Sequence, residues 1–389
     1  MLPENLGLWR VFYGWHGSGT RGDMDAFTPI TKPPFCPNPK CPHHREPTSW
    51  RYVRDGTHSR KNPPLIVQRF KCLTCRRGFS TQTHALGYWC RRQDTFEPVF
   101  RALASCSGLR QIARQLSLTR VEVTCRVERL GRHCLLLNEM LRPKAPPTEP
   151  LVLDGFETFE YSQYAPMHLN LLVGARSLLV YAFTESELRR KGRMTIAQKK
   201  RRAALEERHG RPNPKAIQAG VATLLRLALP PGCTVDLHSD EHPAYPRALA
   251  LVEGASRIQH RTTPSTALRT TRNPLFAVNL TDLLLRHCGA THKRETNAFS
   301  KRRQAVVDRA SIFVTWRNLI KSRSEKAQDD PPAVAWGLLP TRPTIAQILS
   351  RRLFATRIEL PPPLETYYQR RVMTRYLTRQ RVHALKYAY

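Results

Sequence analysis

The chain has 389 residues and is strongly basic, because 63 lysines and arginines stand against 30 aspartates and glutamates, for a formal net charge of +33. The basic residues run along the whole length, so the composition predicts a polyanionic partner, and nucleic acid is the expected one. The 41% hydrophobic content can build two or three cores, which excludes a disordered basic tail, and no apolar run approaches the roughly 18–20 residues of a membrane span.

Two pairs of cysteines mark residues 31–85, which follow an N-terminal extension, residues 1–30. The pairs are Cys36 with Cys41 and Cys72 with Cys75. Thiolates in two such pairs can close a tetrahedral Zn²⁺ site, which holds together a segment too small for a core of its own. The pattern therefore predicts a zinc ribbon with a structural Zn²⁺. The first pair is the wider one and is followed by His43 and His44. One cysteine ligand could therefore be exchanged for one of these histidines.

Residues 86–141 carry apolar side chains at helical spacing, with a break at residues 117–119. This pattern predicts a helix-turn-helix, whose second helix would lie in the major groove of double-stranded DNA. The side chains expected to face bases or phosphates are Arg120, Thr124 and Arg126. Two short amphipathic helices also occur in any small bundle, but the position behind a zinc ribbon favours DNA binding. A proline-rich linker, residues 142–150, then marks a domain boundary.

Residues 151–325 alternate strand-like and helical patterns. Strands are expected at residues 151–154, 167–174, 177–184 and 256–260, with a further strand that ends at Asp240. A basic helical stretch covers residues 185–229, and helices resume over residues 277–322. This order predicts an α+β or α/β fold, in which a mixed sheet is flanked by helices as in an RNase H-like domain. The remaining residues, 326–389, are expected to form a basic accessory region.

Two scarce carboxylates, Asp154 and Asp240, each end one of the strand-like apolar runs. Phosphoryl chemistry with two Mg²⁺ ions about 3.5–4 Å apart needs rigid oxygen ligands, and carboxylates at strand ends provide them. The alternative is that both are ordinary strand-end aspartates that cap turns. In a chain this basic, the pair points to metal-dependent chemistry on a polyanion.

The succession of zinc ribbon, helix-turn-helix and RNase H-like domain resembles the DDE/D transposases of small bacterial insertion sequences. Residues 151–157 look like the first acidic strand of that family, residues 238–245 like the second, and residues 294–302 like the basic stretch after the third acid. The resemblance implies Mg²⁺-dependent cleavage and joining of DNA strands, with transposon ends and target DNA as partners. It also implies a homodimer or larger assembly on DNA, and a cytoplasmic, nucleoid-associated location.

The third acid departs from the family pattern. Where relatives with a glutamate would place it, this sequence has Asn279, with Asp282 one helical turn later. Helix geometry puts Asp282 on the same side as Asn279, so we favour Asp282 as the third Mg²⁺ ligand. Glu295 is the alternative, since it has the longer reach, and the amide oxygen of Asn279 would be a weaker ligand.

Further basic residues are candidates for contacts to the DNA backbone, although each is also ordinary as a solvated cation. They are Arg294, Lys301, Arg302, Arg317 and Lys321. Two rival functions share these features. A transcription regulator could combine the zinc ribbon and helix-turn-helix with an inactive RNase H-like domain, and a repair or structured-RNA nuclease could share the RNase H-like core.

Overall fold

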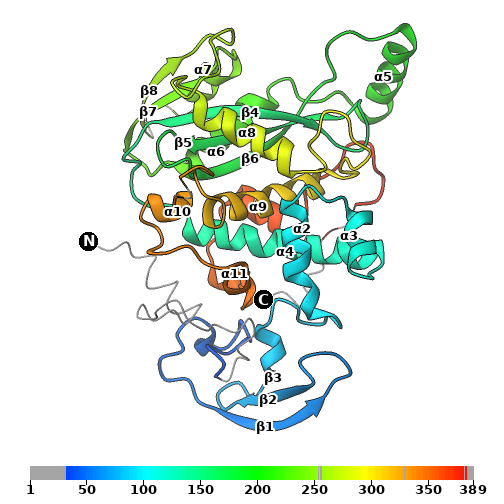
Figure 1. Ribbon diagram of the computed structural model, residues 1–389, viewed down its shortest axis with the longest axis vertical. Helices are drawn as coiled ribbons and strands as arrows, with labels where there is room; N and C mark the ends of the chain where they lie inside the picture. The colour runs from blue at the N-terminus through cyan, green and yellow to red at the C-terminus, as the bar shows by residue number, and fades with distance from the viewer. Residues whose placement is uncertain (1–31, 253, 255, 328, 381, 383–389) are drawn as a thin grey trace.

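The computed structural model describes residues 32–252, 254, 256–327, 329–380 and 382, so the expected N-terminal extension lies outside the described residues. A three-stranded sheet, a five-stranded mixed sheet and helices make up the described chain (Figure 1). The expected mixture of helices and a mixed sheet is therefore confirmed. In the described part of the chain, no helix has the length and apolarity needed to cross a membrane.

The three-stranded sheet is built from short antiparallel strands around the cysteines. Its order is β1 (Tyr52–Ser59), β2 (Ile66–Cys72) and β3 (Gly78–Ser80), and the short helices η1 (Pro42–His44) and η2 (Thr81–His84) flank it. The core beneath it consists of aromatic rings and cysteines, with the rings of Phe70 and Phe79 stacked at 5.5 Å. A core this small needs additional cross-linking to be stable, which is what a metal site supplies.

A helical unit follows, consisting of η3 (Gln93–Thr95), α2 (Phe96–Ala104), α3 (Leu109–Gln115) and α4 (Arg120–Leu141). α4 begins where the sequence predicts it. The hydroxyl of Thr119 accepts from the Glu122 backbone N–H, and the Glu122 carboxylate accepts from the Thr119 N–H. This capping box fixes the start of α4, while its buried apolar residues pack against α2 and α3.

The five-stranded sheet forms the centre of the molecule. Its strands are β4 (Leu151–Phe159), β5 (Pro166–Gly174), β6 (Val180–Glu187), β7 (Thr234–Ser239) and β8 (Arg257–Thr262), in the order β6-β5-β4-β7-β8. β5 runs antiparallel to β4 and β6, whereas β4, β7 and β8 are parallel to one another. All nine residues of β5 are buried, as expected of an inner strand covered on both faces.

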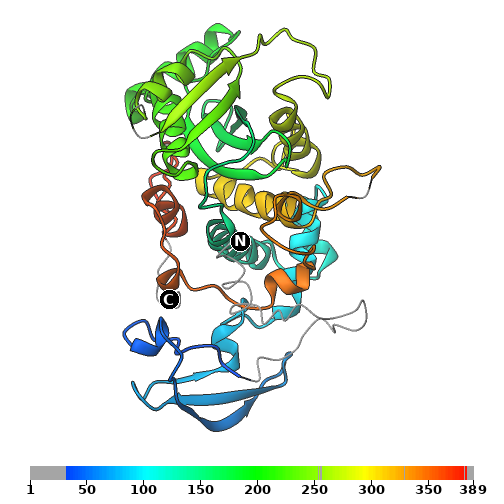
Figure 2. The same cartoon turned by 90° about the vertical axis from the view of Figure 1, so that its left-hand side faces the viewer.

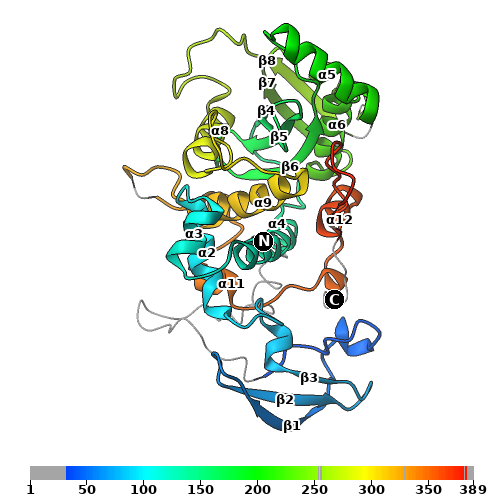
Figure 3. The ribbon, with the colours of Figure 1, turned by 90° about the vertical axis from the view of Figure 1, so that its right-hand side faces the viewer.

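Helices cover both faces of this sheet. α6 (Ala216–Ala228) lies on one face and α8 (Phe276–Cys288) on the other, as Figures 2 and 3 show. α7 (Ala244–Ala250) packs beside α6, and α9 (Arg303–Leu319) lies along α4 and joins the sheet to the helical unit. α5 (Ile196–His209) has no buried residue and projects from the body of the molecule.

The C-terminal region expected to be accessory is packed into the body of the molecule. It contains α10 (Pro332–Ala335), α11 (Ile345–Leu349), η4 (Ala355–Arg357) and α12 (Pro362–Tyr368). Side chains from this region belong to the main core, and Phe354 is fully buried there. The guanidinium of Arg370 also pairs with the buried carboxylate of Asp308 in α9.

Candidate active site and metal centre

Three aspartates from separate elements approach one another at one end of the five-stranded sheet. In the parallel pairing of β4 with β7, Leu153 lies opposite Ser239. The next residues are Asp154 and Asp240, so the pairing sets these two aspartates side by side at the point where β7 ends. Asp282 comes from the middle of α8, the helix that covers this face of the sheet.

The electrostatics of the three carboxylates are coupled. Burial raises the pKa of Asp154 to about 6, and the charge of Asp240 adds to the rise. Burial likewise raises the pKa of Asp282 to about 8, and the charge of Asp154 adds to that rise. The charge of Asp240 acts on Asp154 and that of Asp154 acts on Asp282, so the fold gathers three carboxyl groups here in an otherwise basic protein.

The hydrogen bonds of these aspartates leave room for a cation. Asp154 Oδ1 accepts from the Gly155 N–H at 2.6 Å and from the Tyr245 hydroxyl at 3.3 Å, and Asp240 Oδ1 accepts from the His242 N–H at 2.9 Å. Asp282 Oδ1 is buried without a hydrogen-bond partner. An unsatisfied buried oxygen costs about 1–3 kcal/mol, and a hard cation bound to it would remove that cost.

Carboxylate oxygens are the ligands that Mg²⁺ prefers, so the donor set fits that ion. The three carboxylates are nevertheless less tightly gathered than the cysteines. Among the described residues, only the four cysteines bring their ligand atoms within 4.8 Å of one another.

A polar network missed by the sequence analysis supports the first acidic strand. The ring of His168 in β5 lies against Gly155, where a Cβ atom would be 1.4 Å from His168 Cε1. Asn170 donates through Nδ2 to Thr184 Oγ1 and Ser186 Oγ, both at 3.0 Å. Its Oδ1 therefore accepts from His168 Nδ1–H at 3.0 Å, which leaves Nε2 of the neutral ring as an acceptor. The available signal was the pair of polar residues within an apolar run.

Two arginines lie near the acids, one in a loop and one in α8. The charge of Arg269, in the exposed loop between β8 and α8, lowers the pKa of both Asp154 and Asp282. Arg286, one turn after Asp282 in α8, also lowers the pKa of Asp282. Neither arginine was among the residues expected to contact DNA. The proximity of Arg269 to the acids depends on the path of its loop, whereas Arg286 lies one helical turn from Asp282.

The expected backbone-contacting residues differ in exposure. Arg294 and Lys301 are exposed, and Lys301 Nζ lies 3.1 Å from the centre of the Phe299 ring. Arg302 is half-buried and donates to the Arg379 carbonyl at 2.9 Å. Arg317 is fully buried in α9 and Lys321 pairs with Glu325. In this structure Arg317 is therefore not accessible to DNA.

The competing third ligand, Glu295, is exposed in the segment between α8 and α9. Asn279 lies on α8 one turn before Asp282 and is half-buried. Asp282 has a raised pKa, to which the charge of Asp154 contributes, and an unpaired buried oxygen, whereas the side chain of Glu295 is exposed. The geometry therefore favours Asp282 over Glu295.

The residues expected to contact DNA from a helix-turn-helix separate into exposed and buried ones. Arg120 is exposed at the first turn of α4, and half-buried Thr124 donates to the Arg120 carbonyl at 2.9 Å. Arg126 is 5% exposed and is held by Thr95 Oγ1, the Glu122 carbonyl and the Arg92 carbonyl. Arg126 is therefore not accessible to DNA. Its hydrogen bonds connect α4 to η3.

The four cysteines form a compact cluster. Cys36 Sγ lies 3.6 Å from Cys75 Sγ, and Cys41 Sγ lies 4.0 Å from Cys72 Sγ. A tetrahedron of Zn–S bonds of about 2.3 Å separates the sulfurs by roughly 3.8 Å, so these distances fit a metal such as zinc. They are too long for a disulfide, whose sulfurs are about 2.05 Å apart.

The surroundings of the cluster favour a thiolate at Cys72, whereas burial raises the pKa of Cys36 and of Cys41. Burial opposes ionisation of Cys72, but the backbone N–H of Cys75 and the Trp50 indole N–H, which donates to Cys72 Sγ at 3.3 Å, lower its pKa to about 6. The histidines that stood as alternative ligands are engaged elsewhere. His44 uses both ring nitrogens, with the Cys36 carbonyl at 2.8 Å and Thr356 Oγ1 at 2.7 Å, and His43 Nδ1 contacts the Glu46 carbonyl.

The buried cysteine cluster can thus hold a metal, and the acidic cluster can attract a divalent cation next to arginines suited to phosphate. Function has to be inferred from these groups, since relatives offer no guide. Comparison of the chain with protein-family models and with curated proteins found no match.

Proposed function

We propose that the protein is a DNA transposase of the DDE/D type, which cleaves DNA strands and joins them to a target in a metal-dependent reaction. The observation that carries this proposal is the gathering of Asp154, Asp240 and Asp282 from β4, the end of β7 and α8. Three carboxylates on a rigid sheet and helix, in a chain of net charge +33, suit metal-dependent chemistry on a phosphodiester.

The topology supports an RNase H-like assignment for residues 151–325. Three antiparallel strands, β4 to β6, are followed by β7 and β8, which add in parallel beside β4. The central strand and its parallel neighbour deliver the first two acids, and a helix from later in the chain delivers the third. This is the order of acids that the resemblance to DDE/D transposases implies.

The residues of the site have separable tasks. Asp154, Asp240 and Asp282 would hold Mg²⁺, as two ions in the family mechanism, and the metal would supply charge neutralisation and a water of lowered pKa for attack on the phosphodiester. Arg269 and Arg286, whose charges reach the acids, would bind the phosphate of the scissile strand. His168 and its partner Asn170 hold the backbone around Gly155 in position.

The N-terminal part would select and grip the DNA. A Zn²⁺ bound by Cys36, Cys41, Cys72 and Cys75 would make residues 31–85 a zinc ribbon. α3 and α4 would act as the helix-turn-helix, with exposed Arg110, Arg114 and Arg120 available to double-stranded DNA. Concerted action on two transposon ends would require a homodimer or larger assembly on the DNA.

Nicking of supercoiled plasmid DNA that carries the sequences flanking the gene tests this function. The wild-type protein should nick in the presence of Mg²⁺ and not in a buffer that contains no Mg²⁺. Asp154→Asn and Asp240→Asn should abolish nicking while DNA affinity stays close to that of the wild type, because only the metal ligands are changed.

Glu295→Gln is the matched control, since this exposed carboxylate should be dispensable. Wild-type nicking by Asp154→Asn would contradict the proposal. A wild-type protein that binds the flanking DNA but never nicks it would instead favour a DNA-binding transcription regulator with an inactive RNase H-like domain.

A further inference from the structure

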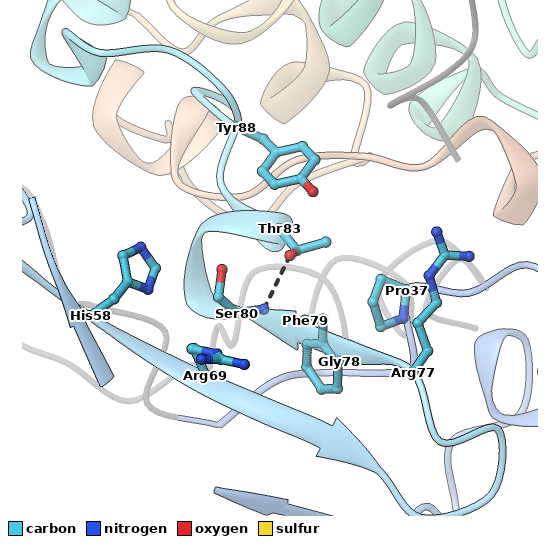
Figure 4. Close-up of a pocket in the computed structure, with 9 residues that line it drawn as sticks. All are labelled: Pro37, His58, Arg69, Arg77, Gly78, Phe79, Ser80, Thr83 and Tyr88. Atoms are coloured by element: carbon cyan, nitrogen blue, oxygen red, sulfur yellow. Dashed lines mark hydrogen bonds between the residues drawn. The ribbon is translucent and has the colours of Figure 1, made fainter. Parts of the chain in front are cut away.

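An open groove of about 460 Å³ lies on the three-stranded sheet, remote in sequence from the acidic site. One wall is formed by the sheet, with His58 from β1, Arg69 from β2 and Ser80 from β3. The opposite wall comes from the segment that leads towards α2, with Thr83 and Tyr88 (Figure 4). Its volume falls in the range of roughly 300–1,000 Å³ that is typical of small-ligand sites.

The chemistry of the lining suits an anion. The guanidinium groups of Arg69 and Arg77, the His58 imidazole and the hydroxyl groups of the two walls can all donate hydrogen bonds, and no carboxylate is among the lining residues. Arg69 pairs with the carboxylate of Asp55, which lies outside the lining, at 3.4 Å. Residues 50–80 carry eight lysines and arginines against this single acid.

The exposure of Arg69 leaves it able to take another partner. Its side chain is 55% exposed, and that of Asp55 is 44% exposed, so the pair is well solvated and weak. A phosphate oxygen that enters the groove could replace Asp55 with a stronger charge-assisted hydrogen bond. Arginine favours such an exchange, because its planar donors match the geometry of phosphate.

The far wall of the groove is fixed to the helix-turn-helix. Arg129 of α4 donates to the Tyr88 carbonyl and, at 3.1 Å, to the Leu86 carbonyl. A phosphate in the groove would therefore sit at a set position relative to α4, the helix assigned to the major groove.

We propose that this groove binds a backbone phosphate of the DNA duplex that α4 contacts, with Arg69 and Arg77 as its cationic ligands. The proposal rests on the DNA-binding part of the proposed function and is independent of the acidic site. Its role is to set the register of the protein on the duplex, because backbone contacts position a protein without reading sequence.

The test measures how DNA affinity depends on salt concentration, using fluorescence anisotropy with a labelled duplex of random sequence and the full-length, zinc-loaded protein. Each lost phosphate contact reduces the slope of log affinity against log salt by about 0.9. Arg69→Gln and Arg77→Gln should each reduce the slope by that amount or less. If both bind one phosphate, the double variant should lose no more than about 0.9 in total.

Arg54→Gln is the matched control, since Arg54 is an exposed arginine of β1 outside the groove lining. It should leave the slope unchanged, and zinc content should be equal in all variants. An unchanged slope in the Arg69 and Arg77 variants, or an equal reduction in the Arg54 variant, would overturn the proposal.

Two further measurements separate this inference from the proposed function. Asp154→Asn should keep the wild-type salt slope without nicking, and Arg69→Gln added to Asp154→Asn should reduce the slope as much as it does in the wild-type protein. Repeating the titration with an RNA duplex tests the choice of nucleic acid. A stronger dependence on Arg69 for RNA than for DNA would count against a DNA phosphate site.

Discussion

At the scale of single residues, Asp282 combines features that cost stability. Its Oδ1 is buried without a hydrogen-bond partner, and burial together with the charge of Asp154 raises its pKa to about 8. In the absence of Mg²⁺ the carboxyl is therefore largely protonated at neutral pH. Groups held in unfavourable surroundings of this kind are concentrated at functional sites, where a ligand or substrate compensates for the cost.

This cost predicts how stability varies with pH in the zinc-loaded protein without Mg²⁺. Asp282 has a pKa of about 8 when folded against 3.8 for an ordinary aspartate, so between these values the folded state binds more protons than the unfolded state. The contribution of Asp282 to the free energy of unfolding is fully present below about pH 4 and is lost as the pH rises towards 8. Asp154, with a folded pKa of about 6, acts in the same direction.

We expect Asp282→Asn to remove part of this decline and to raise the free energy of unfolding at about pH 8 by roughly 0.5–2 kcal/mol. Urea unfolding at several pH values measures the effect. Glu295→Gln provides the control and should follow the wild-type curve, because that side chain is exposed. A wild-type pH profile in the Asp282 variant would show that this carboxyl is not under electrostatic strain.

Part of the candidate site could be predicted from the sequence. Asp154 and Asp240 could be predicted, because each follows a strand-like apolar run and strand pairing brings such positions together. The contributions of His168 and Arg269 could not be predicted. That of His168 depends on a hydrogen-bond network across strands, and that of Arg269 depends on the path of a loop. Sequence periodicity carries no information about either.

At the scale of elements, α4 shows how one helix can contain arginines with different tasks. Arg120 is exposed at its first turn, whereas Arg126 is buried and bonded to the carbonyls of Glu122 and Arg92. Both arginines lie in the predicted helix and look equivalent in the sequence. Only the packing of η3 against α4 distinguishes them.

The two arginines should respond differently to truncation. Arg120→Ala should weaken binding to a cognate DNA end by about 1–3 kcal/mol if it contacts a base edge, with little change in stability. Arg126→Ala should instead lower the free energy of unfolding by about 1–3 kcal/mol, since it leaves buried carbonyl groups unpaired. DNA titrations and urea unfolding of both variants check this, and the reverse pattern would return Arg126 to the DNA surface.

Strands and helices were predicted with fair accuracy where periodicity is strong. β5 and the start of α4 fall close to their expected bounds, because continuous burial and a capping box leave clear patterns. The burial of the C-terminal region was not predicted, because its apolar residues are scattered among prolines and arginines in short segments. Their burial depends on the sheet and α9, which lie far away in the sequence.

At the scale of the whole molecule, contacts from the C-terminal region join the cysteine domain, residues 32–85, to the body of the molecule. His44 Nε2 contacts Thr356 Oγ1 at 2.7 Å, and the rings of Phe35 and Phe354 meet at 5.0 Å. The backbone N–H of Arg352 also donates to the His84 carbonyl at 2.8 Å. Order in the cysteine domain should therefore stabilise the segment around η4.

We expect about one Zn²⁺ per chain, since four thiolates close a single tetrahedral site. Removing the metal, or replacing Cys72 with serine, should unfold β1 to β3 and increase hydrogen exchange there and around η4, while β4 and β5 stay protected. Elemental analysis and hydrogen exchange measure both effects. Full protection of β1 to β3 in metal-free protein would contradict a structural role for the metal.

The central claim is that Asp154, Asp240 and Asp282 together hold a divalent cation. The most direct test is binding of Mn²⁺, as a paramagnetic substitute for Mg²⁺, to the zinc-loaded protein, followed by electron paramagnetic resonance. The wild-type protein and Glu295→Gln should bind Mn²⁺ saturably and release it to Mg²⁺, whereas Asp154→Asn and Asp282→Asn should not. Wild-type Mn²⁺ affinity in the Asp154 variant would contradict the claim.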